Sequence, residues 1–95
     1  MNKLSHIINR NYNSIIERGL ITKHTTKEDF LNKLIEESSE VYEAIDKKDD
    51  ENLSEELADV ILTVLNFAKH YDIDIENELN KKIKKNYERA KNKLK

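Results

Sequence analysis

Proline is absent from this chain of 95 residues, and glycine occurs once, at Gly19. Turns between strands prefer glycine and proline, so a sheet domain of this length, which needs many turns, is not compatible with the sequence. The chain is long enough for one domain, which we place at residues 1–95. Cysteine is also absent, so neither disulfides nor a cysteine-based zinc site can stabilise it. The fold class we predict is all-α, built from long, well-packed helices and completed by self-association.

Apolar side chains at helical spacing predict four helices. The first covers about residues 2–18, and Gly19 suits its C-terminal end. The second runs from Thr25 or Thr26 to about residue 47, with Thr25 and Glu28 as a capping box. The third runs from Asn52 or Ser54 to about residue 70, and the fourth begins after Asp72 or Asp74. We therefore expect a four-helix bundle.

The third predicted helix is apolar around more than one face, from Leu57 to Ala68. A helix of this kind is buried on most of its sides. Four helices of this length cannot cover it completely within one chain. This pattern predicts burial against another subunit.

Charge is segregated along the chain although the formal net charge is only −2. Residues 28–59 hold 13 acidic and 3 basic residues, a net of −10, whereas residues 81–95 hold 8 basic and 1 acidic, a net of +7. An acidic patch and a basic patch suit a metal–phosphate ligand, because Mg²⁺ binds carboxylates and phosphates bind cations. No apolar run approaches the roughly 20 residues of a membrane span. The first residues do not resemble a signal peptide, so we expect a cytoplasmic protein without a membrane partner.

Two pairs of acidic residues stand out in the acidic region. Glu37 and Glu40 lie three residues apart on the second predicted helix, and Glu56 and Asp59 on the third. Side chains at this spacing share one helix face. Each pair lies about 9–10 residues, or roughly 14 Å, from the polar turn between the helices. In an antiparallel hairpin the two pairs therefore face each other at one level.

Four neighbouring carboxylates repel one another, and a divalent cation removes that cost. A set of oxygen ligands without His or Cys selects a hard metal, Mg²⁺ or Mn²⁺. Any one such pair would more often be a solvated helix face, so it is the matched height of the two pairs that indicates a site. His6, His24 and His70 do not suggest a site.

The stretch KLIEESSEVYEAI and the later EELADVILTVLNFAKHYDIDIENELNKKIKKNYER resemble the MazG-like all-α nucleoside triphosphate pyrophosphohydrolase superfamily. The family pattern E-E-x-x-E, a spacer, and E-x-x-D is present as Glu36, Glu37 and Glu40, then 15 residues, then Glu56 and Asp59. The resemblance covers about residues 30–90. It implies a MazG-like bundle that hydrolyses a (deoxy)nucleoside triphosphate (dNTP or NTP) to a monophosphate and pyrophosphate.

The resemblance also implies a homodimer or a tetramer in which the site is completed across subunits, and it implies roles for individual residues. The metal ligands would be Glu37, Glu40, Glu56 and Asp59, and the catalytic carboxylates would be Glu36, Glu37 and Glu40. Lys82, Asn86 and Arg89 match a K-x-x-x-N-x-x-R pattern and would bind the phosphates; their spacing places them on one helix face. Candidates for recognition of the base come from the first helix and the connection after it: Tyr12, Asn13, Arg18 and His24.

Two alternatives stay open from the sequence. One is phosphoribosyl-ATP pyrophosphohydrolase of histidine biosynthesis, which has a similar E-E-x-x-E motif. The other is a non-enzymatic helical protein whose basic C-terminal region binds nucleic acid. Nucleic acid is the less expected partner, because the aromatic and loop signatures of common nucleic-acid-binding modules are absent.

Overall fold

The computed structural model describes residues 3–93 and shows four helices with no strand in that range. These are α1 (Lys3–Glu17), α2 (Lys27–Asp46), α3 (Asp50–His70) and α4 (Ile75–Lys93). The all-α prediction is confirmed. Among the described residues, no helix is long and apolar enough to cross a membrane.

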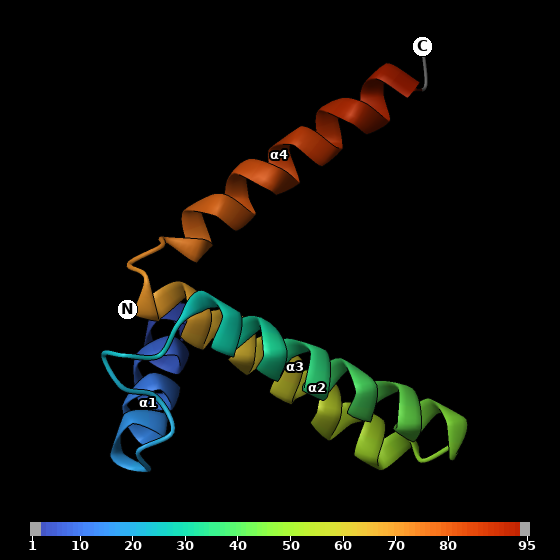
Figure 1. Cartoon of the computed structure of the whole chain (residues 1–95). Coiled ribbons are helices and arrows are strands. Elements are labelled where there is room, and N and C mark those ends of the chain that lie inside the picture. The colour runs from blue at the N-terminus through green and yellow to red at the C-terminus, as the bar shows by residue number, and fades with distance from the viewer. Residues whose placement is uncertain (1–2, 94–95) are drawn as a thin grey trace.

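Helices α2 and α3 form an antiparallel hairpin, and α1 packs against α3 near its C-terminal end (Figure 1). The core lies at that end. Phe30 of α2 is 4% exposed, and its ring stacks on Phe67 of α3 with a centroid distance of 4.9 Å. His70 and Tyr71 pack against Phe30 from the end of α3. This aromatic cluster fixes the open ends of the hairpin.

Three of the four helices end in the same way. Gly19, Lys48 and Asp72 each follow a helix in the left-handed region, with φ of 72°, 57° and 53°. In each case the next residue donates its backbone N–H to the carbonyl five positions earlier, as Asp49 does to Ala44 at 2.9 Å. This is the Schellman motif, which satisfies helix-end carbonyls. At Asp49 it reverses the chain within three residues and sets the hairpin.

The predicted start of the second helix at Thr25 or Thr26 is confirmed, since Thr26 is the N-cap of α2, but the predicted capping pair and the predicted start of the third helix were wrong. The capping box of α2 joins Thr26 and Asp29 rather than Thr25 and Glu28, because Thr25 Oγ1 instead accepts the backbone N–H of Thr22. The N-cap of α3 is Asp49, which accepts the N–H of Asn52 at 3.1 Å, so the helix begins ahead of the expected position. Of the two residues expected to cap α4, Asp74 accepts the N–H of Asn77 at 3.1 Å.

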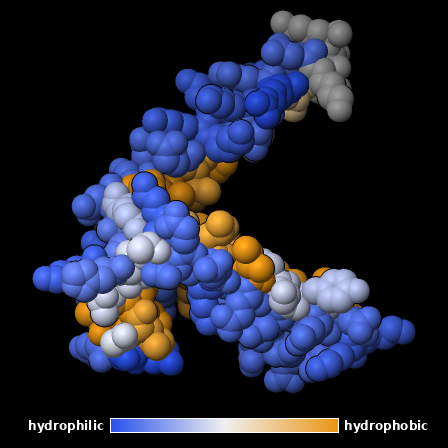
Figure 2. Space-filling view, viewed as in Figure 1, coloured by the Kyte–Doolittle hydropathy of each residue, from blue (hydrophilic) through white to orange (hydrophobic). Residues whose placement is uncertain are grey.

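Helix α4 extends away from the other three helices, so one chain does not form a closed bundle (Figure 1). Apolar side chains of the hairpin and of α4 are consequently exposed. Figure 2 shows apolar surface along the side of the hairpin that faces α4 and on the facing side of α4. The exposed large apolar side chains of these helices are Leu31, Ile35, Tyr42 and Ile45 of α2, Leu57, Ile61 and Val64 of α3, and Leu79, Ile83 and Tyr87 of α4.

Candidate metal centre

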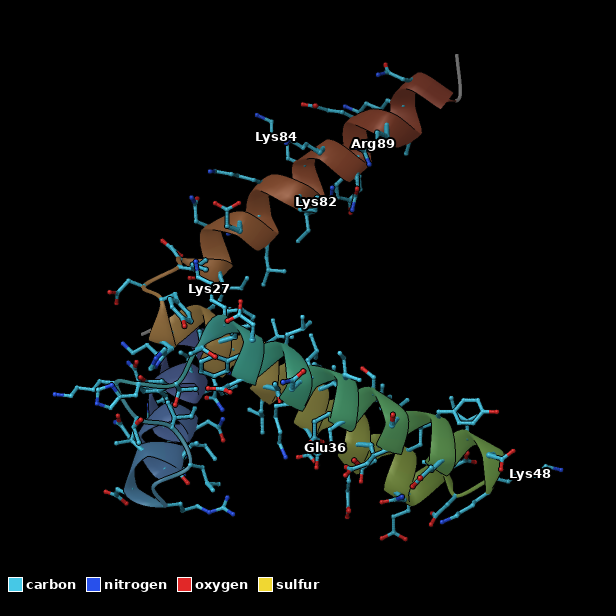
Figure 3. The ribbon with its side chains drawn as sticks, in the orientation of Figure 1. Lys27, Glu36, Lys48, Lys82, Lys84 and Arg89 are labelled. Carbon is cyan, nitrogen blue, oxygen red and sulfur yellow. The ribbon has the colours of Figure 1, made fainter. Side chains whose placement is uncertain are left out.

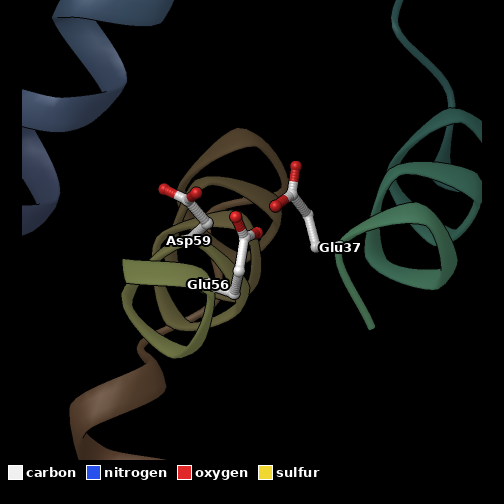
Figure 4. Close-up of side chains that lie close together, drawn as sticks. All are labelled: Glu37, Glu56 and Asp59. Atoms are coloured by element: carbon white, nitrogen blue, oxygen red, sulfur yellow. The ribbon is translucent and has the colours of Figure 1, made fainter. Parts of the chain in front are cut away.

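The hairpin brings carboxylates from α2 and α3 together. Glu37 of α2 and Glu56 and Asp59 of α3 each offer one oxygen, and these oxygens lie within 4.8 Å of one another (Figure 4). The side chains converge from the facing sides of the two helices. Glu56 and Asp59 are three residues apart, so they project from one face of α3, while Glu37 meets them from α2. This geometry follows from their matched distance to the turn.

The cluster contains buried oxygens without a partner. Glu37 is 6% exposed, and its Oε2 has no hydrogen-bond partner in residues 3–93; the same holds for Oε2 of Glu56. A buried polar atom without a partner costs free energy, and more so when it carries charge. A divalent cation between these oxygens would satisfy both. The donor set is made of oxygen alone, which fits Mg²⁺ or Mn²⁺.

Glu40, the fourth predicted ligand, is half-buried beside this cluster and is not part of the group of three. Its hydrogen bond with Glu56, together with the nearby charge of Glu37, raises the pKa of Glu40 to about 7. Repulsion between carboxylates therefore keeps a proton on Glu40 under mildly acidic conditions.

Lys33 supplies a positive charge at the cluster. Its Nζ lies 3.0 Å from Oε1 of Glu37, one helical turn away, and 3.8 Å from Oε1 of Glu36. The hydrogen bond to Glu37 raises the pKa of Lys33, so the ammonium stays charged. Glu36 itself is an exposed side chain of α2 (Figure 3). Sequence reasoning missed Lys33, although its four-residue spacing to Glu37 was a usable signal.

A pocket of about 480 Å³ adjoins the cluster between α1, α2 and α3. Glu37, Asp59 and Lys33 line it, and Asn66 of α3 lies about 10 Å further along the helix from Asp59, at two turns' distance. Asn66 is buried, and its Oδ1 accepts a hydrogen bond of 2.9 Å from Nδ2 of Asn11 on α1. The pocket thus has an acidic end and an amide-lined end.

Of the four residues predicted to recognise a base, Arg18 lines this pocket. Tyr12 instead forms a hydrogen bond with His70, and its hydroxyl oxygen lies 2.8 Å from Nδ1 of that histidine. Asn13 and His24 are exposed and do not belong to the pocket lining. Asn11 and Asn66, which sequence reasoning missed, carry no signal in their spacing because they come from helices far apart in the chain.

The predicted phosphate-binding residues Lys82, Asn86 and Arg89 are exposed on α4. Figure 3 shows Lys82 and Arg89 on the extended helix, away from the hairpin that carries the carboxylates. The structure of one chain therefore does not bring the basic residues and the acidic cluster together.

A comparison with known protein families gave a match. The family model described as MazG nucleotide pyrophosphohydrolase domain matches residues 25–94, which include the cluster, most of the pocket and α4. Neither the curated proteins nor the solved structures gave a match.

Proposed function

Because the chain belongs to the MazG nucleotide pyrophosphohydrolase family, we propose that it is a Mg²⁺-dependent enzyme that cleaves a (deoxy)nucleoside triphosphate to a monophosphate and pyrophosphate. The observation that carries this proposal is the cluster of Glu37, Glu56 and Asp59, in which two buried carboxylate oxygens have no hydrogen-bond partner within residues 3–93. The adjoining pocket has room for a nucleotide, since its volume of about 480 Å³ is within the range of small-molecule sites.

Glu37, Glu40, Glu56 and Asp59 would hold the cation, Mg²⁺ or Mn²⁺. When bound, the cation lowers the pKa of a coordinated water and stabilises negative charge on the leaving pyrophosphate. Glu40 lies close enough to join the three clustered carboxylates, because it is hydrogen-bonded to Glu56. In the absence of the cation, that hydrogen bond holds the proton that a metal ion would replace.

The reaction we propose is attack of water on the α-phosphorus. A bond forms between the water oxygen and phosphorus, the bond to the β-phosphate breaks, and pyrophosphate leaves with the bonding electrons. The water proton passes to a carboxylate of the set Glu36, Glu37 and Glu40. Glu40 suits this role because it lies beside the three clustered carboxylates, where a coordinated water would be within reach of its side chain.

The nucleoside end of the substrate would lie at the amide-lined end of the pocket. Asn66 lies about 10 Å from Asp59 along α3, a spacing comparable to that between a nucleotide's phosphate and its base. The paired amides of Asn11 and Asn66 leave a donor and an acceptor for a base edge. Arg18 lines the same pocket and would contact the base or the sugar there, whereas Tyr12, Asn13 and His24 do not belong to its lining.

A second copy of the chain would complete the site. Lys82, Asn86 and Arg89 project from an α4 that is not packed on its own hairpin, whereas the hairpin and α4 both expose apolar side chains (Figure 2). Packing α4 of one copy on the hairpin of another would bury these side chains and bring the basic face toward the carboxylates. The apolar area and the charge asymmetry both support a homodimer or a higher homo-oligomer.

The test is a pyrophosphate-release screen across the common NTPs and dNTPs with Mg²⁺ and with Mn²⁺, using phosphoribosyl-ATP as a separate substrate. We expect metal-dependent release from at least one nucleoside triphosphate. Turnover of phosphoribosyl-ATP alone would assign the histidine-pathway reaction instead. Salt-sensitive DNA binding without any pyrophosphate release would reject the enzymatic proposal in favour of the nucleic-acid alternative.

A further inference from the structure

Lys33 occupies a position between the carboxylate cluster and the pocket. Its Nζ is 3.0 Å from Oε1 of the buried Glu37, and its side chain also lines the pocket. Within residues 3–93, Lys33 forms the ion pairs that reach Glu36 and Glu37, and the remaining pair joins Lys81 to Glu78 on α4. Among the described residues, Lys33 is therefore the basic side chain whose ion pairs reach the carboxylate cluster.

The two oxygens of Glu37 have different surroundings. Oε1 accepts from the Lys33 ammonium, whereas Oε2 is buried and has no hydrogen-bond partner in the part of the chain that the structure describes. A cation bound through Oε2 would share the carboxylate with the ammonium on Oε1. The two positive groups would then repel each other over a short distance, because both contact the same buried carboxylate.

An anion in the pocket would reverse this effect. The Lys33 side chain is 53% exposed, and its flexible stem ends in three N–H donors, of which Glu37 uses one. The ammonium can thus keep its bond to Glu37 while it donates to an oxygen in the pocket. A phosphate held beside both positive groups would offset their repulsion and gain a charge-assisted hydrogen bond.

We propose that Lys33 couples cation binding to polyphosphate binding. Its ammonium opposes the divalent cation when the pocket lacks a ligand, and it contacts a phosphate oxygen when cation and polyphosphate bind together. This inference rests on the proposed function, because it takes the cluster as the metal site, and it assigns to that site a residue that regulates occupancy.

The test measures binding rather than turnover. Calorimetric titrations would be done with Mn²⁺ alone and with preformed Mn²⁺–triphosphate, which carries the polyphosphate without a base. We expect Lys33→Met to bind Mn²⁺ alone about fivefold more tightly than the wild type, as for an ordinary coupling between sites. We expect it to bind Mn²⁺–triphosphate about tenfold more weakly, from loss of a charge-assisted hydrogen bond. Lys33→Arg, which keeps the charge, should return both affinities toward the wild type.

The matched control is Lys47→Met, an identical substitution at an exposed lysine 14 residues along the chain, beyond the end of α2. It should leave both affinities unchanged. Far-UV circular dichroism would check each variant for folding, with Lys33→Gln as the substitute if the Met variant aggregates. Equal weakening of both ligands, or no change in either, overturns the role of Lys33 while leaving the metal site in place. A wild type that binds neither ligand overturns the metal site and this inference with it.

Discussion

Glu40 of α2 and Glu56 of α3 share a hydrogen bond between two carboxyl groups, and this bond raises the pKa of Glu40 to about 7. The two residues belong to different acidic pairs of the sequence, so their contact joins the pairs across the hairpin. The partnerless oxygen on Glu56 lies in the same group of side chains. Folding thus holds acidic groups together although they repel, a conflict that a bound cation would resolve.

The first prediction concerns pH. Because folding raises the pKa of Glu40 from 4.5 to about 7, the folded chain binds more protons than the unfolded chain between these values. The metal-free protein should therefore lose stability as pH rises through this window and lose no more from this group above it. Thermal unfolding from pH 4.5 to 8.5 measures the effect, and Glu40→Gln should flatten the profile. A stability profile that is unchanged in Glu40→Gln would contradict this explanation.

The proton on Glu40 competes with a cation, so stabilisation by Mg²⁺ should be larger at pH 8 than at pH 5.5.

The second prediction concerns the aromatic cluster. Phe30 is 4% exposed and stacks on Phe67 at 4.9 Å, at the end of the hairpin where α1 also packs. Phe30→Ala should lower the free energy of unfolding by about 3–5 kcal/mol, the usual cost of removing a buried aromatic ring. Urea denaturation measures it, with Phe30→Leu as the milder comparison. A loss of less than about 1 kcal/mol would show that the hairpin does not depend on this contact.

The third prediction concerns the turn between α2 and α3. Lys48 has a φ of 57°, a conformation that costs a side-chain-bearing residue about 1–2 kcal/mol. Lys48→Gly should raise the free energy of unfolding by up to about 1 kcal/mol. Glycine has no strain at a positive φ, and this relief exceeds the cost of the greater conformational entropy that glycine gives the unfolded chain. Lys47→Gly is the matched control, since Lys47 has a φ of −82° and should lose stability on the same substitution. If both variants lose stability alike, the left-handed turn is not the reason.

The fourth prediction concerns the proposed second copy. If α4 of one chain serves the carboxylates of another, a chain with Asp59→Asn and a chain with Arg89→Ala should each be inactive alone. Mixed after unfolding and refolding together, they should recover part of the activity, because some assemblies pair an intact cluster with an intact α4. Replacing the exposed Ile61 with Asp should shift the sedimentation of the protein toward the monomer. If mixed assemblies form but activity does not recover, Arg89 and the other basic residues of α4 lie outside the site.

The sequence alone was sufficient to predict four helices and the level at which the acidic pairs meet. Helical spacing and distance from the turn depend on local geometry, and both are visible in residue numbers. The exact capping pair of α2 could not be predicted, because Thr25–Glu28 and Thr26–Asp29 fit the capping pattern equally. The choice follows from the hydrogen bond that Thr25 Oγ1 accepts from the backbone N–H of Thr22. A left-handed lysine at position 48 was equally hidden, since lysine carries no preference for that conformation.

The environment of the site was less predictable. The contact of Asn11 with Asn66 spans 55 residues, and it depends on how α1 crosses α3 rather than on any spacing. Lys33 was within reach of helical spacing, but a lysine near glutamates on a helix is so common that the spacing alone does not single it out. The position of α4 was beyond sequence reasoning for a physical reason, because its apolar face can be buried on another chain as well as on its own.

Magnesium-dependent release of pyrophosphate by Asp59→Asn tests the central claim most directly, since this substitution removes one charge from the cluster and changes little else. The measurement compares the variant with the wild type on the nucleotide that the wild type turns over best, with Asp46→Asn as the control at an exposed acidic residue of α2. We expect Asp59→Asn to lose at least about a hundredfold in activity while its circular dichroism stays unchanged, and Asp46→Asn to keep full activity. A folded Asp59→Asn variant with wild-type activity would contradict the assignment of this cluster as the metal centre.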